Sequence, residues 1–128
     1  MAIRVLIVDD HEPFLEAATS LLQHDGGVQV VGVASTSAEA LLQAELLRPD
    51  VALVDVMLGR ESGFELTRRL NQEVWFAHRA VILVSTHSEA DLVDLVRESS
   101  AIGFLPKSEL SADAIRRIVN GREGALSS

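Results

Sequence analysis

The sequence predicts a doubly wound α/β fold, in which helices cover both faces of one parallel sheet. Five short segments rich in Val, Ile and Leu have the near-continuous hydrophobicity of strands buried on both faces. These segments are 3–8, 28–33, 51–54, 81–84 and 101–105. Amphipathic segments alternate with them, and this alternation is typical of β–α units joined by right-handed crossovers.

Helix signals appear in order between the apolar segments. The start signals are Pro13 in a first turn, the capping boxes Thr36–Glu39 and Ser62–Glu65, and the N-cap residues Ser88 (with Asp91) and Ser111. Apolar residues at helical spacing are Phe14, Ala18, Leu21 and Leu22, then Leu92, Leu95 and Val96, then Ile115, Ile118 and Val119. Five strands and five helices favour the flavodoxin-like strand order 2-1-3-4-5.

Composition indicates one globular domain. The chain has 128 residues, of which 48% are hydrophobic and 23% are charged, and this is ordinary for a globular domain. It has no cysteine, which excludes disulfide scaffolds and thiolate chemistry. The formal net charge of −8 repels phosphate backbones, so we expect no direct nucleic-acid contact.

The chain ends carry two further expectations. The first ten residues, MAIRVLIVDD, lack the long apolar region of a signal peptide, and no window approaches the length of a membrane span. We therefore expect a cytoplasmic protein without membrane contact. We expect one domain over residues 1–121, followed by a tail or the start of a linker over 122–128.

Polar side chains follow four of the five predicted strands. Asp9 and Asp10 follow the first strand, Asp55 the third, Ser85 ends the fourth, and Lys107 follows the fifth. In the order 2-1-3-4-5 these strand ends are neighbours, and ligands of such sheets bind at that edge. The sequence therefore predicts a site with three carboxylates, a hydroxyl and an ammonium group.

This set of side chains suits phosphoryl chemistry. Two carboxylates about 4 Å apart repel by about 4 kcal/mol at an effective dielectric near 20, and a divalent cation removes this repulsion. Hard oxygen ligands favour Mg²⁺ or Mn²⁺. A carboxylate can act as a nucleophile to give an aspartyl phosphate. Asp55 is the candidate because it stands alone at the end of a central strand.

At these residues the chain resembles the receiver domain of two-component response regulators, over roughly residues 3–121. The motifs are IVDD with Asp9 and Asp10, LVDVMLG with Asp55, ILVST with Ser85, and GFLPK with Phe104 and Lys107. The spacings also match, since Asp55 lies 45 residues beyond Asp10, Ser85 lies 30 beyond Asp55, and Lys107 lies 22 beyond Ser85. The motifs DDHEPF and GFLPKSELS resemble the LuxR/NarL-like branch, whose receivers usually precede a DNA-binding domain.

The resemblance implies a role for each matching residue. Asp55 is the expected phosphoacceptor, and the expected Mg²⁺ ligands are Asp9, Asp10, Asp55 and the backbone carbonyl of Met57. Ser85 and Lys107 are expected to bind the phosphoryl group. Ser85 and Phe104 are the expected switch pair. The implied partner is a sensor histidine kinase, and homodimerisation on phosphorylation stays open.

Some positions depart from the family pattern. Gly59 stands where the family usually has Pro, which predicts a more mobile loop, and Ser108 replaces the Pro that usually follows the lysine. Thr86 stands where the family often has Ala or Gly, so its bulk could limit access to the phosphoryl group. None of these changes removes a required chemical group.

Other interpretations stay open beside this one. Each site residue taken alone suits a turn, a cap or a solvated surface, and Phe104 alone suits core packing. A pseudo-receiver regulated without phosphate is the first alternative function. A Mg²⁺-dependent aspartyl phosphatase is a second, although such enzymes carry a D-x-D pair that the adjacent Asp9–Asp10 does not form.

Overall fold

The computed structural model describes residues 2–24, 26–86 and 92–127, with side chains as far as Gly121. In this part of the chain, five parallel strands form one sheet in the order β2-β1-β3-β6-β7. The strands are β1 (Ile3–Val8), β2 (Val28–Ala34), β3 (Val51–Asp55), β6 (Ala80–Ser85) and β7 (Gly103–Pro106). Counted within the sheet this order is 2-1-3-4-5, which confirms the predicted topology.

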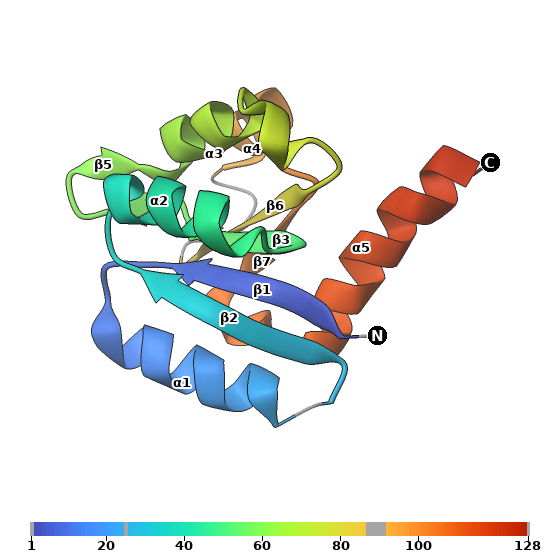
Figure 1. The fold of residues 1–128 in the computed structure, drawn as a ribbon, viewed down its shortest axis with the longest axis horizontal. Helices are drawn as coiled ribbons and strands as arrows, with labels where there is room; N and C mark the ends of the chain where they lie inside the picture. The colour runs from blue at the N-terminus through green and yellow to red at the C-terminus, as the bar shows by residue number, and fades with distance from the viewer. Residues whose placement is uncertain (1, 25, 87–91, 128) are drawn as a thin grey trace.

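Helices cover both faces of the sheet (Figure 1). On one face lie α1 (Glu12–Gln23) and α5 (Ala112–Ser127), whose buried Leu15 and Ile115 join the core cluster on that side. On the other face lie α2 (Ser37–Leu47), α3 (Gly63–Asn71) and α4 (Val93–Glu98). The sheet is therefore doubly wound, as the sequence predicts.

Successive residues of the central strands pack alternately into two core clusters, one on each face of the sheet. In β1, Val5 and Ile7 belong to the core cluster under α1 and α5, whereas Leu6 and Val8 belong to the cluster under α2 and α3. All four side chains have no exposed surface. A strand buried on both faces in this way needs the continuous apolar run that the sequence shows.

Short elements that the sequence did not predict connect the main ones. Strands β4 (Met57–Leu58) and β5 (Glu61–Ser62) form an antiparallel hairpin directly after β3. Two 3₁₀ turns, η1 (Val74–Phe76) and η3 (Lys107–Glu109), follow α3 and β7. Two- and three-residue elements are too short to produce a periodic pattern in the sequence.

The predicted helix starts agree with the structure where it describes them. Pro13 lies in the first turn of α1, and Thr36 caps α2 by accepting a hydrogen bond from the Glu39 N–H. Ser62 and Ser111 accept hydrogen bonds from N–H groups in the first turns of α3 and α5. Ser88, predicted as an N-cap with Asp91, lies outside the described residues.

Three details of the prediction are wrong. Leu21 of α1 is 52% exposed, because the buried stripe of this helix is Leu15, Ala18 and Leu22. Leu95 of α4 is 48% exposed, because this six-residue helix buries none of its side chains. The last strand begins at Gly103, since pairing with β6 starts only where Gly103 lies opposite Ile82.

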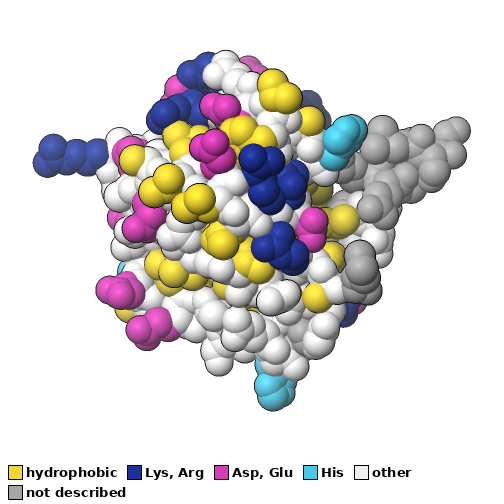
Figure 2. Space-filling model, viewed as in Figure 1, with side chains coloured by type: hydrophobic (Ala, Val, Ile, Leu, Met, Phe, Trp, Pro, Cys, Tyr) yellow, Lys and Arg dark blue, Asp and Glu magenta, His cyan; other side chains and the backbone are white. Residues whose placement is uncertain are grey.

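Helix α2 leaves part of its apolar surface uncovered. Leu42 and Leu46 are 59% and 72% exposed, and Figure 2 shows hydrophobic side chains gathered over this helix, with Lys or Arg side chains toward its C-terminal end. In the described part of the chain, no helix has both the length and the apolar character needed to cross a membrane.

We predict that Leu53→Ala, in the centre of β3, destabilises the protein by about 2–5 kcal/mol, because it leaves a cavity where no surface is exposed. Leu46→Ala, the same change at a largely exposed position, should alter the free energy of unfolding by less than about 0.5 kcal/mol. Urea unfolding of both variants and wild type tests this. Equal losses in the two variants would contradict the assigned core.

Candidate functional site

Three carboxylates meet at the edge of the sheet where the strands end. Asp9 and Asp10 follow β1, and Asp55 is the last residue of β3. Each of the three offers an oxygen atom that lies within 4.8 Å of the other two. Asp9 and Asp55 are buried and Asp10 is exposed.

Strand register explains why these acids converge. β1 pairs in parallel with β3, with Val8 opposite Val54, so the next residues, Asp9 and Asp55, leave the sheet at the same level. Successive residues of an extended chain point to opposite sides, which separates the buried Asp9 from the exposed Asp10. Asp10 borders a hollow of about 370 Å³ that Glu12 and Glu39 also line.

A lysine that follows β7, two strands away from β3 in the sheet, reaches into the acidic cluster. β6 and β7 pair in parallel with Ser85 opposite Pro106. The next residue, Lys107, therefore lies just beyond the end of β6. Its Nζ lies 2.5 Å from Asp9 Oδ2 and 3.1 Å from Asp55 Oδ2. The Lys107 side chain is only 13% exposed, so solvent screens these ion pairs less than it would at the surface.

Backbone groups hold the other carboxylate oxygens. Asp55 Oδ1 accepts a hydrogen bond from the Met57 N–H at 3.1 Å, and Asp9 Oδ1 accepts one from the His11 N–H at 2.8 Å. Asp9 Oδ2, although close to Lys107 Nζ, makes no hydrogen bond of good geometry among the described residues. This buried oxygen is therefore paired by charge alone.

The surroundings shift the pKa values of Asp55 and Lys107. Burial raises the pKa of Asp55, and the nearby Asp9 charge adds to this, while the Met57 N–H and Lys107 offset it only in part. For Lys107, burial acts to lower the pKa, but its ion pairs with Asp9 and Asp55 outweigh burial and raise it. Ionised Asp55 is thus costly in this site, and Lys107 keeps its positive charge.

The acidic cluster fits a divalent cation. It offers oxygen donors only, which suits Mg²⁺ or Mn²⁺. The buried Asp9 Oδ2 lacks a hydrogen bond from the described residues, and a metal or its water shell can supply such a partner. A cation would also offset the charge that raises the pKa of Asp55.

The other predicted residues lie around this cluster. Ser85 is buried at the end of β6, and Phe104 is half-buried in β7 against the core cluster under α3. The Met57 side chain and Thr86 are exposed. Gly59 has a φ of +60° in the hairpin between β4 and β5, a conformation that glycine adopts without strain.

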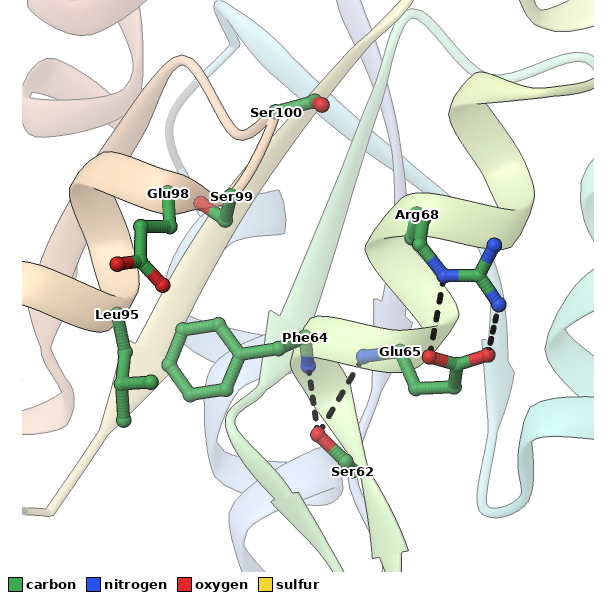
Figure 3. Close-up of a pocket in the computed structure, with 8 residues that line it drawn as sticks. All are labelled: Ser62, Phe64, Glu65, Arg68, Leu95, Glu98, Ser99 and Ser100. Atoms are coloured by element: carbon green, nitrogen blue, oxygen red, sulfur yellow. Dashed lines mark hydrogen bonds and ion pairs between the residues drawn. The ribbon is translucent and has the colours of Figure 1, made fainter.

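A hollow between α3 and α4 is separate from the acidic cluster. Its volume is about 350 Å³, and none of the acidic cluster residues lines it. Figure 3 shows Phe64 and Leu95 facing each other across it, while Glu65 pairs with Arg68 at one side. The strand-end carboxylates and lysine, rather than this hollow, hold the groups suited to phosphoryl chemistry.

The family model of the response regulator receiver domain matches residues 5–120, which is most of the chain. The chain belongs to this family. It is therefore a receiver domain of a two-component system, as the sequence motifs indicate. Receiver domains of these systems work with sensor histidine kinases.

Curated relatives support this membership. The receiver is 34% identical over 116 residues to the response regulator GacA of Pseudomonas viridiflava, and 32% identical over 122 residues to the transcriptional regulatory protein LiaR of Bacillus subtilis. These alignments cover 91% and 93% of this chain but only 53% and 57% of the relatives. The chain thus spans about half the length of these relatives.

Solved structures show the same fold. The receiver domain of NarL from Mycobacterium tuberculosis superposes with a TM-score of 0.81 at 29% identity, covering 96% of this chain and 98% of that one. A LuxR-family response regulator from Aurantimonas sp. SI85-9A1 gives 0.83 at 26% identity, with coverage of 94% and 87%. This agrees with the predicted LuxR/NarL-like branch.

Two residues that support the receiver site were missed in the sequence. A Cβ on Gly63 would lie 1.9 Å from the Asp55 backbone oxygen, and the Gly63 N–H bonds to the Val56 carbonyl at 2.9 Å. Helical spacing predicts only a packing position for Phe14, yet its ring centroid lies 4.3 Å from Lys107 Nζ. A glycine directly after the Ser62 N-cap was the one available signal for Gly63.

We predict that Gly63→Ala destabilises the receiver by about 1–3 kcal/mol or more, because the added methyl group collides with the Asp55 backbone. Gly121→Ala is the matched control, since a Cβ there meets nothing within 4 Å, and alanine favours the helix by about 0.5–1 kcal/mol. Thermal unfolding of both variants tests this. Wild-type stability in Gly63→Ala would show that α3 does not rest on the Asp55 backbone.

We also predict that Asp55→Asn stabilises the metal-free receiver at neutral pH, because it removes the buried charge whose pKa is raised. A raised folded pKa means that wild type loses stability as the pH rises through the range between the unfolded and folded values. The gain should therefore vanish in acid, below both values. Urea unfolding with a chelator at acidic and neutral pH measures it, and a loss of stability at neutral pH would contradict the assigned sign.

Proposed function

We propose that this receiver accepts a phosphoryl group from the phosphohistidine of a sensor histidine kinase on Asp55, with Mg²⁺, and that phosphorylation changes its α4–β7–α5 surface. The observation that carries the proposal is the position of Lys107, whose Nζ pairs with both Asp9 and Asp55 beside a three-carboxylate cluster. A cation next to grouped acids at a strand edge is the arrangement that phosphoryl transfer requires.

Asp55 is the proposed nucleophile. Its carboxylate is oriented by the Met57 N–H on one oxygen and by Lys107 on the other. In the transfer, an Asp55 oxygen forms the new bond to phosphorus while the bond from phosphorus to the histidine nitrogen breaks. The electron pair of the broken bond stays on the imidazole of the kinase, and the product is an aspartyl phosphate.

The proposed metal ligands are Asp9, Asp10, Asp55 and the Met57 backbone carbonyl. The convergence of the carboxylate oxygens and the buried Asp9 Oδ2 without a hydrogen bond from the described residues support this assignment. Bound Mg²⁺ would neutralise charge on the acids and on the transferring phosphoryl group. The protein contributes the fixed spacing of the ligands, which follows from the pairing of β1 with β3.

Lys107 and Ser85 are the proposed contacts of the transferred group. Lys107 keeps its charge because nearby acids raise its pKa, so it can pair with a phosphoryl oxygen in place of Asp55. Ser85 ends β6 next to β7, from which Lys107 emerges, and its hydroxyl can donate a hydrogen bond to a second oxygen. Charge-assisted hydrogen bonds of this kind contribute about 1.5–3 kcal/mol each.

Phosphorylation is proposed to act as a switch through Ser85 and Phe104. The phosphoryl group adds a charge of about −1.5 to −2, and Ser85 would move toward it. Phe104 is half-buried beside the strand that carries Ser85, so its ring can occupy the space that Ser85 leaves. Inverting a 1:99 population needs about 5.5 kcal/mol, which two or three such hydrogen bonds supply.

The output surface and domain boundary complete the proposal. Val93 and Leu95 of α4 are 38% and 48% exposed beside this surface, which offers apolar area to a partner or to a second phosphorylated copy. We propose that the receiver lies within residues 1–121 and that 122–128 form a tail or linker, into which α5 continues as far as Ser127. An output domain that binds DNA is proposed because the motifs resemble the LuxR/NarL-like branch, and because LiaR, a transcriptional regulatory protein, extends beyond the matched region.

Labelling by acetyl phosphate in the presence of Mg²⁺, read by intact-mass spectrometry, tests the phosphoacceptor. We expect wild type to gain the mass of one phosphoryl group and Asp55→Asn to gain none. Asp50→Asn is the matched control, because Asp50 lies just before the other end of β3 and should label like wild type. Removing Mg²⁺ with a chelator should abolish labelling of wild type and of Asp50→Asn.

Two outcomes would contradict the proposal. A full mass gain in Asp55→Asn would assign the phosphoryl group to another residue. No gain in folded wild type, either from acetyl phosphate or from a phosphorylated sensor kinase, together with no binding of beryllofluoride, would favour a pseudo-receiver regulated without phosphate. Turnover of a small phosphomonoester would instead favour the aspartyl phosphatase.

A further inference from the structure

An aromatic ring from α1 lies against the functional lysine. The Nζ atom of Lys107 lies 4.3 Å from the centroid of the Phe14 ring, on the same ammonium group that pairs with Asp9 and Asp55. Phe14 is half-buried and packs against the core cluster that includes Leu15 and Ile115. Among the described residues, the ammonium group therefore has two charged neighbours, Asp9 and Asp55, and one aromatic neighbour, Phe14.

We propose that Phe14 is a positioning residue that holds the Lys107 ammonium over the acidic edge of the sheet during phosphoryl transfer to Asp55. This inference rests on the proposed function of Asp55 and Lys107. A cation is attracted to the electron-rich face of an aromatic ring, and the attraction grows when the cation is shielded from water. Lys107 meets this condition because its side chain is only 13% exposed.

The ring matters because the ionic partners of Lys107 change in the reaction. In the resting protein Asp9 and Asp55 hold the ammonium group. The proposed metal takes oxygens from the same two acids, and phosphorylation converts one Asp55 oxygen into an ester. The Phe14 ring carries no charge and joins neither event, so it is the one neighbour in this set whose hold on Lys107 stays constant.

The fold fixes the ring where this role requires it. Phe14 lies in the first turn of α1, only four residues after Asp10, with Pro13 restricting the backbone just before it. The next residue, Leu15, is buried in the core and anchors this turn. The anchored turn therefore keeps the Phe14 backbone close to the acidic pair.

A fluorination series at Phe14 tests the proposal. Replacing Phe14 with mono-, di- and trifluorophenylalanine weakens the negative ring face in steps while nearly preserving its size. We expect the rate of Mg²⁺-dependent labelling by acetyl phosphate to fall in the same order, by about tenfold across the series and by a similar factor in Phe14→Leu. Thermal unfolding should stay close to wild type in the fluorinated proteins.

Phe64→Leu is the matched control. Phe64 is also half-buried in a first helical turn, but it packs against the core cluster on the opposite face of the sheet. It should label at the wild-type rate. Phe14→Trp, which keeps an electron-rich ring, should label faster than Phe14→Leu. If Phe14→Leu labels slowly but the rate does not depend on fluorination, Phe14 contributes only by packing, and the proposal is overturned.

A second measurement separates this inference from the proposed function. In the resting protein, protons on the Lys107 carbon next to Nζ should show an upfield ring-current shift in the NMR spectrum, which Phe14→Leu abolishes and Phe64→Leu preserves. If wild type fails to label, the proposed function fails, and this shift still shows whether Phe14 holds Lys107. An unshifted signal in wild type overturns the inference even when Asp55 is phosphorylated.

Discussion

The ion pairs of Lys107 with Asp9 and Asp55 are the interaction on which the site depends. Three carboxylates at one edge repel one another, and two of them are buried. Two such charges about 4 Å apart cost about 4 kcal/mol at an effective dielectric near 20. Lys107 lies between two of these acids, yet the pKa of Asp55 stays raised, chiefly by burial and further by the Asp9 charge. Additional positive charge at this edge would stabilise ionised Asp55, which supports the proposed metal site.

The parallel pairing of the strands brings these charged side chains to one edge of the sheet. Strands that run the same way end at the same edge, so β1 and β3 deliver their acids to one place and β7 delivers the lysine. The apolar residues of β1 and β3 are buried on both faces of the sheet. A one-residue shift in register would turn each core side chain toward the cluster on the opposite face. The same burial that stabilises the sheet thus fixes the distances between the charged groups.

This link between strand burial and the positions of the charged groups explains what the sequence could and could not predict. The strands, their order and the residues at their ends follow from apolar runs and from the polar residues after them, and Asp9, Asp55 and Lys107 do meet. Leu21 and Leu95 were misplaced because helical spacing does not show which side of a stripe meets the core, nor how short a helix is. Close approaches such as Gly63 to the Asp55 carbonyl depend on tertiary packing alone.

Packing from both faces of the sheet therefore defines the site as much as the charged residues do. On one face, α3 begins at Gly63 in direct contact with the Asp55 backbone, so this helix limits where the Asp55 carboxylate lies. On the other face, α1 brings the Phe14 ring to within 4.3 Å of the Lys107 ammonium group. The two helices pack in separate core clusters, and the ion pair between Lys107 and Asp55 connects the two sides of the site. In the proposed phosphoryl transfer, a small shift of either helix changes the gap that receives the phosphoryl group, and this would give the charge change at Asp55 a mechanical path to the outer faces of the fold.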